Sequence, residues 1–187
     1  MLRRRVRQLD PVLVVTAVIV AVALVALAFA VGAGPAHAAS GGIGLEPSSG
    51  QPTKAKLAGN GEAIPPAGAP KEVVRAIKAG NKIRRKPYRW GGGHRRFKDS
   101  GYDCSGAVSY VLHAAKMLDS PLPSGPLMRW GQRGKGDWIT VYAHGGHTYA
   151  MIAGLRWDTS GTGGKGPRWQ KDKRSKRGFA VRHFAGF

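Results

Sequence analysis

The only cysteine of the chain, Cys104, is the residue with the clearest chemical use. It stands in Tyr102-Asp103-Cys104-Ser105-Gly106, directly before apolar residues at helical spacing, so we expect it at the start of a helix. A helix N-terminus offers unpaired N–H groups and positive partial charge, which favour a thiolate and can stabilise an oxyanion. An inert interpretation stays open, because cysteine is among the most frequently buried residues and Cys104 continues the apolar stripe.

A nucleophilic thiol needs a base, and His147, which precedes an apolar run, is a candidate. If Ala153-Gly154 forms a hairpin turn, residue 160 lies opposite His147, and Asp158 lies on the same sheet face one diagonal step away. A carboxylate there would orient the imidazole as the third member of a triad. Three alternatives remain: His144 is a competing base, His147 can be an ordinary strand-edge histidine, and Asp158 can be a solvated turn residue.

Two helices and several short strands are expected to position these residues. Apolar residues on one face predict a helix over Lys71–Lys82, which Pro87 ends, and a longer stripe predicts a second helix from Cys104 to Leu118. Helices followed by strands indicate an α+β domain, with the helices packed on a small antiparallel sheet. Alternating or β-rich segments predict strands at Trp138–Tyr142, Thr148–Ala153, Leu155–Thr159 and Phe179–Phe184.

Other chemistry finds little support in the sequence. The run Gly91–Gly93 lacks the Gly-Lys-Ser/Thr that completes a phosphate-binding loop. The pair His144 and His147 has no cysteine or His-Glu-x-x-His pattern beside it, so we expect no metal and no cofactor. A single cysteine also excludes an intramolecular disulfide.

The first 70 residues carry a targeting segment and a linker. Arginines precede an apolar run from Val12 to Val31, and Ala36-His37-Ala38 follows it. This order is typical of a secretory signal, although the run is also long enough to be a retained membrane anchor. We therefore assign residues 1–38 to a signal peptide or anchor. Residues 39–70, rich in glycine and proline, form an expected linker before a domain at 71–187.

The charge of the chain indicates a polyanionic partner. The net charge is +20, and residues 1–38 hold four of the 30 basic and one of the 10 acidic residues, so the remainder keeps +17. Export makes nucleic acid an improbable partner and favours anionic cell-wall polymers or lipid headgroups. The most basic stretch, Lys165–Arg177, lies in a Gly-rich segment, Gly161–Gly178, that we expect to be a loop. It is either a solvated surface or an anion-binding patch.

Four segments of the chain form a pattern when they are taken together. They are Pro87-Tyr88-Arg89-Trp90-Gly91-Gly92, Tyr102-Asp103-Cys104-Ser105-Gly106, Gly136-Asp137-Trp138, and His147 with the apolar strand and Gly154 after it. In combination these motifs resemble the NlpC family of papain-like cell-wall cysteine peptidases. The resemblance covers roughly residues 71–160, in the order that the family uses.

The resemblance implies an exported, monomeric peptidoglycan endopeptidase that cleaves stem-peptide amide bonds through an acyl-enzyme. Cys104 would be the nucleophile and His147 the base, while Asp158 matches the family's third polar position only approximately. Tyr88, Trp90, Asp103 and Ser105 would bind the substrate.

Two other functions remain open. One is a non-catalytic module that uses its basic surface to hold cell-wall polymer. The other is a thiol amidase or acyltransferase on the same fold, because one fold can host several thiol acyl-transfer reactions.

Overall fold

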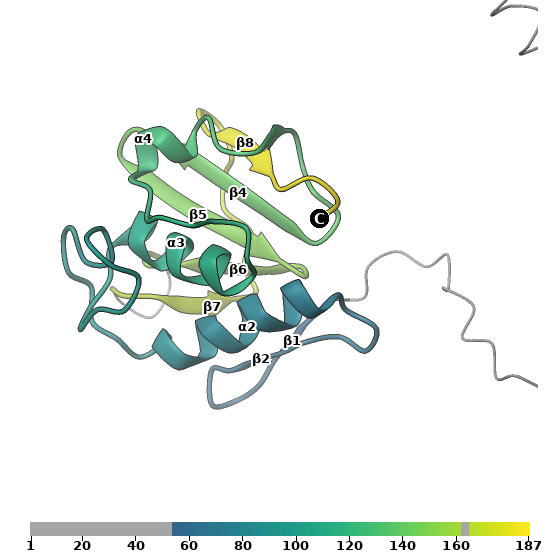
Figure 1. The fold of residues 1–187 in the computed structure, drawn as a ribbon. Helices are drawn as coiled ribbons and strands as arrows, with labels where there is room; N and C mark the ends of the chain where they lie inside the picture. The colour runs from purple at the N-terminus through teal and green to yellow at the C-terminus, as the bar shows by residue number, and fades with distance from the viewer. Residues whose placement is uncertain (1–53, 162–164) are drawn as a thin grey trace, which may run out of the picture. The chain divides into compact units, whose positions relative to one another are not determined.

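A computed structural model describes residues 54–161 and 165–187, and these residues form an α+β fold (Figure 1). The predicted signal peptide or anchor, residues 1–38, and the first part of the predicted linker lie outside the described residues. Within the described ranges, no helix is long and apolar enough to cross a membrane.

One antiparallel sheet of six strands carries the domain, in the order β3-β8-β4-β5-β6-β7. Four of its strands correspond to the predicted ones, and β3 and β7 were not predicted. Along β4 and β5, every second side chain belongs to the hydrophobic core, so one face of the sheet lies in the core and the other face is turned away from it. The strands are β3 Gln132–Arg133, β4 Ile139–His144, β5 His147–Ile152, β6 Leu155–Asp158, β7 Arg168–Gln170 and β8 Ala180–His183.

Two helices cover the core face of this sheet: α2 (Lys71–Ile83) and α3 (Cys104–Ala114) (Figure 1). A short third helix, α4 (Ser124–Leu127), follows them. The helix α3 ends before the predicted Leu118, and Lys116 just beyond it has a left-handed φ of 61°. The predicted fold class, helices packed on a small antiparallel sheet with Cys104 at a helix start, is confirmed.

Two tryptophans attach the far strands to the helices. The Trp157 Nε1–H of β6 donates to the Ala107 carbonyl of α3 at 3.0 Å, and the Trp169 Nε1–H of β7 donates to Asn81 Oδ1 of α2 at 2.9 Å. A Cβ atom at Gly80 would lie 2.5 Å from the Trp169 ring, so α2 needs glycine there to reach β7. These contacts order part of the Gly161–Gly178 segment, which the sequence analysis treated wholly as a loop.

Residues 54–70 also pack on the domain, so the expected linker does not extend through them. They contain a two-stranded sheet of β1 (Lys56–Leu57) and β2 (Ala63–Ile64). The side chain of Asn81 in α2 accepts from the Ala63 N–H and donates to the Ala63 carbonyl, both at 2.9 Å. The partly buried amide side chain of Asn81 thus satisfies the backbone of β2.

Candidate active site

The glycine run after Trp90 packs against the start of α3. A Cβ atom on Gly106 would lie 1.9 Å from the Gly92 carbonyl oxygen, and Gly93 has a φ of +84°. The Asp103 carboxylate accepts from the N–H of Gly106 at 2.8 Å and from the N–H of Gly91 at 3.1 Å. Asp103 therefore caps the helix and ties the glycine run to it, which fixes the backbone on both sides of residue 104.

The Cys104 thiol lies in this fixed frame as the first residue of α3, with 8% of the residue exposed. Its Sγ is 3.8 Å from the Ser124 Oγ of α4, and His147 is near enough to act on its pKa. Burial raises the pKa of the thiol, but the hydrogen bonds with His147 and Ser124 and the charge of His147 outweigh burial and hold the pKa below its ordinary value. The site therefore favours the thiolate.

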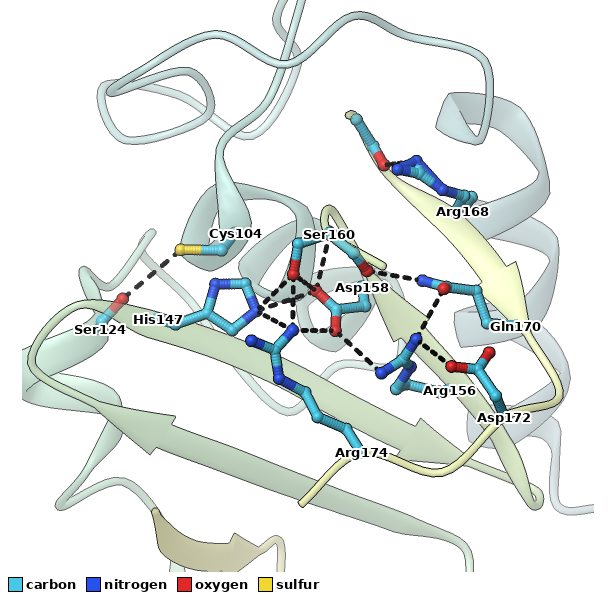
Figure 2. Close-up of polar contacts among 11 residues, drawn as sticks. Cys104, Ser124, His147, Arg156, Asp158, Ser160, Arg168, Gln170, Asp172 and Arg174 are labelled. Carbon is cyan, nitrogen blue, oxygen red and sulfur yellow. Dashed lines mark hydrogen bonds and ion pairs between the residues drawn. The ribbon is translucent and has the colours of Figure 1, made fainter. Parts of the chain in front are cut away.

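The His147 ring lies between the cysteine and a carboxylate, as Figure 2 shows. Its Nε2 is 2.9 Å from Asp158 Oδ1, which leaves Nδ1 for the cysteine. Burial lowers the pKa of His147, but hydrogen bonds with Asp158 and Cys104 and the charges of both outweigh it and raise the pKa to about 9. The lowered pKa of Cys104 and the raised pKa of His147 both favour a pair of thiolate and imidazolium.

The β5–β6 hairpin brings His147 and Asp158 together with the expected register. Ile152 pairs with Leu155 across a turn in which Ala153 and Gly154 have φ values of 45° and 81°. Two positive φ angles are typical of the tight hairpin turn that suits the twist of the strands. The carboxylate of Asp158 thus lies on the same sheet face as His147.

The competing base, His144, is directed elsewhere. It pairs with His147 across β4 and β5, and its Nδ1 accepts from the Gly146 N–H at 3.0 Å. Its ring packs on Phe179, with 4.3 Å between the ring centroids. Of the two histidines, His147 is the one that lowers the pKa of the cysteine.

The Asp158 carboxylate is 1% exposed and is surrounded by positive groups. Burial raises its pKa, but hydrogen bonds with His147 and the Ser160 N–H and the charges of His147 and Arg174 outweigh burial and lower it. Arg174 Nη1 donates to Asp158 Oδ2 at 3.1 Å, and Arg156 Nη1 lies 3.7 Å from the same oxygen. Asp158 therefore stays ionised when it receives the His147 hydrogen bond.

Arg174 comes from the basic segment that the sequence left without a specific role. Besides Asp158, its Nη1 donates to the Ser160 Oγ at 2.6 Å (Figure 2). Four residues of the site were not predicted from the sequence. They are the arginines Arg156 and Arg174 and the serines Ser124 and Ser160. The run Lys165–Arg177 was the available signal, but seven basic residues without periodicity do not show which one reaches the site.

Two of the four predicted substrate-binding residues are open to solvent. Tyr88 is 36% exposed, and burial together with the negative charges of Cys104 and Asp103 raises the pKa of its phenol. Trp90 is 89% exposed. Their contact with a substrate remains a prediction.

The other two, Asp103 and Ser105, are 4% and 2% exposed. His94 Nε2, which the sequence analysis did not consider, lies 2.9 Å from Asp103 Oδ2 and 2.9 Å from the Ser105 Oγ. Much of their hydrogen-bonding capacity is thus used inside the protein, where they hold the start of α3. Direct substrate contact by Asp103 and Ser105 also remains a prediction.

Residues 54–161 and 165–187 contain no group of three or more His, Cys, Asp or Glu side chains that could hold a metal ion. The chemistry that the described residues support is that of a thiolate, an imidazolium and an ionised carboxylate in sequence.

No protein-family model and no curated protein matches the chain. The peptidoglycan hydrolase RipB from Mycobacterium tuberculosis is 25% identical over 64% of this chain and 68% of its own, with a TM-score of 0.48. A hypothetical invasion protein of the same organism is 21% identical over 70% and 71%, with a TM-score of 0.46. RipD of that organism, a non-catalytic NlpC/p60 domain protein, is 18% identical over 62% and 98%, with a TM-score of 0.44. NlpC/P60 domain proteins, whose family the sequence motifs resemble, are thus among the structural matches.

Proposed function

We propose that this chain is an exported cysteine peptidase that hydrolyses amide bonds in the stem peptides of peptidoglycan. The observation that carries the proposal is the position of the His147 ring between Cys104 and Asp158 (Figure 2), with 2.9 Å between His147 Nε2 and Asp158 Oδ1. A partly buried histidine whose pKa is raised to about 9, near a thiol of lowered pKa, is the arrangement that nucleophilic thiol catalysis needs.

In the first half of the reaction, the Cys104 thiolate attacks the carbonyl carbon of the amide. The carbonyl oxygen takes the negative charge, and N–H groups at the start of α3 are available to stabilise it. The His147 imidazolium then gives its proton to the leaving amine as the C–N bond breaks. A thioester between Cys104 and the acyl part of the peptide remains.

In the second half, the now neutral His147 takes a proton from a water molecule, and the resulting hydroxide attacks the thioester carbon. The C–S bond breaks, Cys104 leaves as a thiolate, and His147 is again an imidazolium. Asp158 holds the ring orientation throughout and stays ionised, because Arg174 and the Ser160 N–H also bind it.

Export and the basic surface fit this substrate. Residues 1–38 carry the pattern of a signal or anchor, and the remaining chain has a net charge of +17. An anionic cell wall would keep such a protein close to its substrate, although charge supplies attraction and not cleavage.

The test is to incubate the wild-type chain and a Cys104→Ala variant with purified peptidoglycan and to determine the masses of the soluble fragments. We expect fragments cut within the stem peptide from the wild type and none from the variant. Cuts at the junction of sugar and peptide would instead identify an amidase. Equal release by both proteins would exclude the proposed chemistry.

The alternative of a non-catalytic wall-binding module is favoured by the burial of Cys104, of which only 8% is exposed, because a substrate must still reach the thiol. In that case the wild type and the Cys104→Ala variant would sediment equally with the cell wall, and neither would release fragments.

A further inference from the structure

A groove with a cavity of about 320 Å³ lies on the outer face of the sheet. Tyr142 and Tyr149 line it, while their neighbours Val141 and Ala150 point into the core with the helices. Successive side chains of a strand point to opposite faces, so the groove and the helices lie on opposite sides of the sheet. Of the residues that line the groove, the proposed peptidase chemistry uses only Arg174.

Four cationic side chains gather around the cavity. Lys135 comes from the turn before β4, and Lys173, Arg174 and Lys176 come from the basic segment after β7. No aspartate or glutamate lines the groove among the described residues. Cations brought together from two parts of the chain repel one another unless an anion lies between them.

The floor of the groove offers hydrogen-bond donors as well as charge. The rings of Tyr142 and Tyr149 are stacked, with 4.8 Å between their centroids and 5° between their planes. Neither hydroxyl group has a hydrogen-bond partner within residues 54–161 and 165–187. Burial raises the pKa of both phenols, that of Tyr149 to about 12, so both remain protonated donors at neutral pH.

Arg174 connects this groove to the thiol site. Its Nη1 donates to Asp158 and Ser160, while its Cζ lies 5.9 Å from the centroid of the Tyr149 ring. Its Nε and Nη2 make no hydrogen bond to the described residues, so one edge of the guanidinium holds the catalytic carboxylate and other donors remain for a ligand.

We propose that the groove binds an anionic group carried on a polyol or sugar chain, a phosphodiester or a carboxylate of a cell-wall polymer. The three lysines supply point charges, Arg174 and the two phenols supply directed donors, and the cavity has room for one charged unit of such a chain. The site is separate from the thiol, and its ligand reaches the catalytic carboxylate only through Arg174.

Binding is measured by calorimetry with the full chain carrying Cys104→Ala, so that failure of catalysis does not affect the result. The probes are poly(glycerol phosphate), oligogalacturonate and neutral dextran. We expect salt-dependent binding of at least one anionic polymer and none of dextran, and the preferred probe identifies phosphate or carboxylate as the ligand. Equal binding of dextran, or no binding of either anionic polymer, would overturn the proposal.

A matched pair of charge variants locates the site. Lys135→Ala with Lys176→Ala removes two charges from the groove, and Lys78→Ala with Lys82→Ala removes two exposed charges from α2 on the other side of the sheet. We expect the groove variant to bind about fivefold more weakly or worse, and the α2 variant to change by less than about twofold. Equal losses would show that net charge alone attracts the polymer and would contradict a site.

Two further experiments test the hydroxyl donors of the groove and its connection to the thiol site through Arg174. Tyr142→Phe with Tyr149→Phe keeps both rings and should weaken binding about threefold or more. In the protein with Cys104 intact, the bound polymer should change the rate at which iodoacetamide alkylates the thiol, and Arg174→Ala should remove that change. Unaltered binding by the phenylalanine variant, or an unaltered alkylation rate, would contradict the assigned roles.

Discussion

The two halves of the candidate site are built in different ways. The thiol half, from Gly91 to Gly106, is fixed by backbone contacts within a short stretch of sequence: a glycine run, a helix cap and one close approach of main chains. The base half joins His147 and Asp158 to Arg174 through charged side chains from different parts of the chain. The first half sets where the sulfur lies, and the second sets the charge of the base that acts on it.

This difference predicts different kinds of failure. A change in the thiol half should disturb folding, because rigid main-chain contacts cannot adjust. A change in the base half should leave the fold largely intact and alter the pH dependence of the reaction, because it acts on pKa values. The four variants below separate the two kinds of failure, in decreasing order of expected effect.

Asp158→Asn should have the largest effect on activity, a loss of about 100-fold or more, because the amide no longer stabilises the imidazolium. Asp158 raises the pKa of His147, so its removal must lower that pKa from about 9 toward the ordinary value of 6.5. The alkaline fall in activity should therefore begin at lower pH. The measurement is the release of peptidoglycan fragments between pH 5 and 10, and an unchanged alkaline limb would contradict the role of Asp158.

Gly106→Ala should destabilise the fold by about 3 kcal/mol, because its Cβ would lie 1.9 Å from the Gly92 carbonyl oxygen. Denaturant unfolding measures the change in the free energy of unfolding. The matched control is Gly59→Ala, where the added Cβ meets no atom within 4 Å and the change should stay within about 0.5 kcal/mol. Similar values for both variants would show that the glycine run does not fix α3.

Arg174→Ala should reduce activity about tenfold, since Asp158 loses one of the groups that position it. Hydrogen bonds with His147 and the Ser160 N–H, the charge of His147 and, to a smaller extent, the charge of Arg174 outweigh burial and lower the pKa of Asp158 in the folded state. The part that Arg174 contributes stabilises the fold above the pKa of Asp158 in the unfolded chain, and it is lost as the pH falls through the lower pKa of the folded state. The difference in the free energy of unfolding between wild type and variant should therefore have its full value above about pH 5 and decrease at lower pH. Arg177→Ala, an exposed arginine of the same segment, is the control and should match the wild type.

Trp90→Ala should have the smallest effect on the fold. With 89% of Trp90 exposed, the free energy of unfolding should change by less than about 0.5 kcal/mol. If Trp90 binds the substrate as predicted, the KM for a soluble stem peptide should rise a few-fold while kcat stays constant. A KM equal to that of the wild type would remove Trp90 from the substrate-binding residues.

Local sequence predicted the thiol half and part of the base half. The position of Cys104 at a helix start follows from the apolar stripe after it, and the pairing of β5 with β6 follows from the turn at Ala153-Gly154. A two-residue turn determines the register of a hairpin, which is why the sequence could place Asp158 on the face of His147.

The remaining contacts depend on tertiary packing, which no local pattern contains. Arg174 follows β7, and β7 is placed by Trp169 against Gly80 and Asn81, almost ninety residues earlier in the chain. The packing of residues 54–70 on the domain also depends on a tertiary contact, because Asn81 hydrogen-bonds with the backbone of Ala63 as well. A basic, Gly-rich composition correctly indicated exposed segments and could not show that one arginine returns to a buried carboxylate.

The central claim is that Cys104 and His147 exist as thiolate and imidazolium, and the pH dependence of Cys104 alkylation by iodoacetamide tests it most directly. Cys104 is the only thiol of the chain, so the reaction reports on one site. The midpoint of the rise in rate should lie below pH 9, because the thiol pKa is lowered, and His147→Ala should move this rise to higher pH. A wild-type rate that rises only near pH 9, as for an ordinary thiol, and coincides with that of His147→Ala would contradict the account.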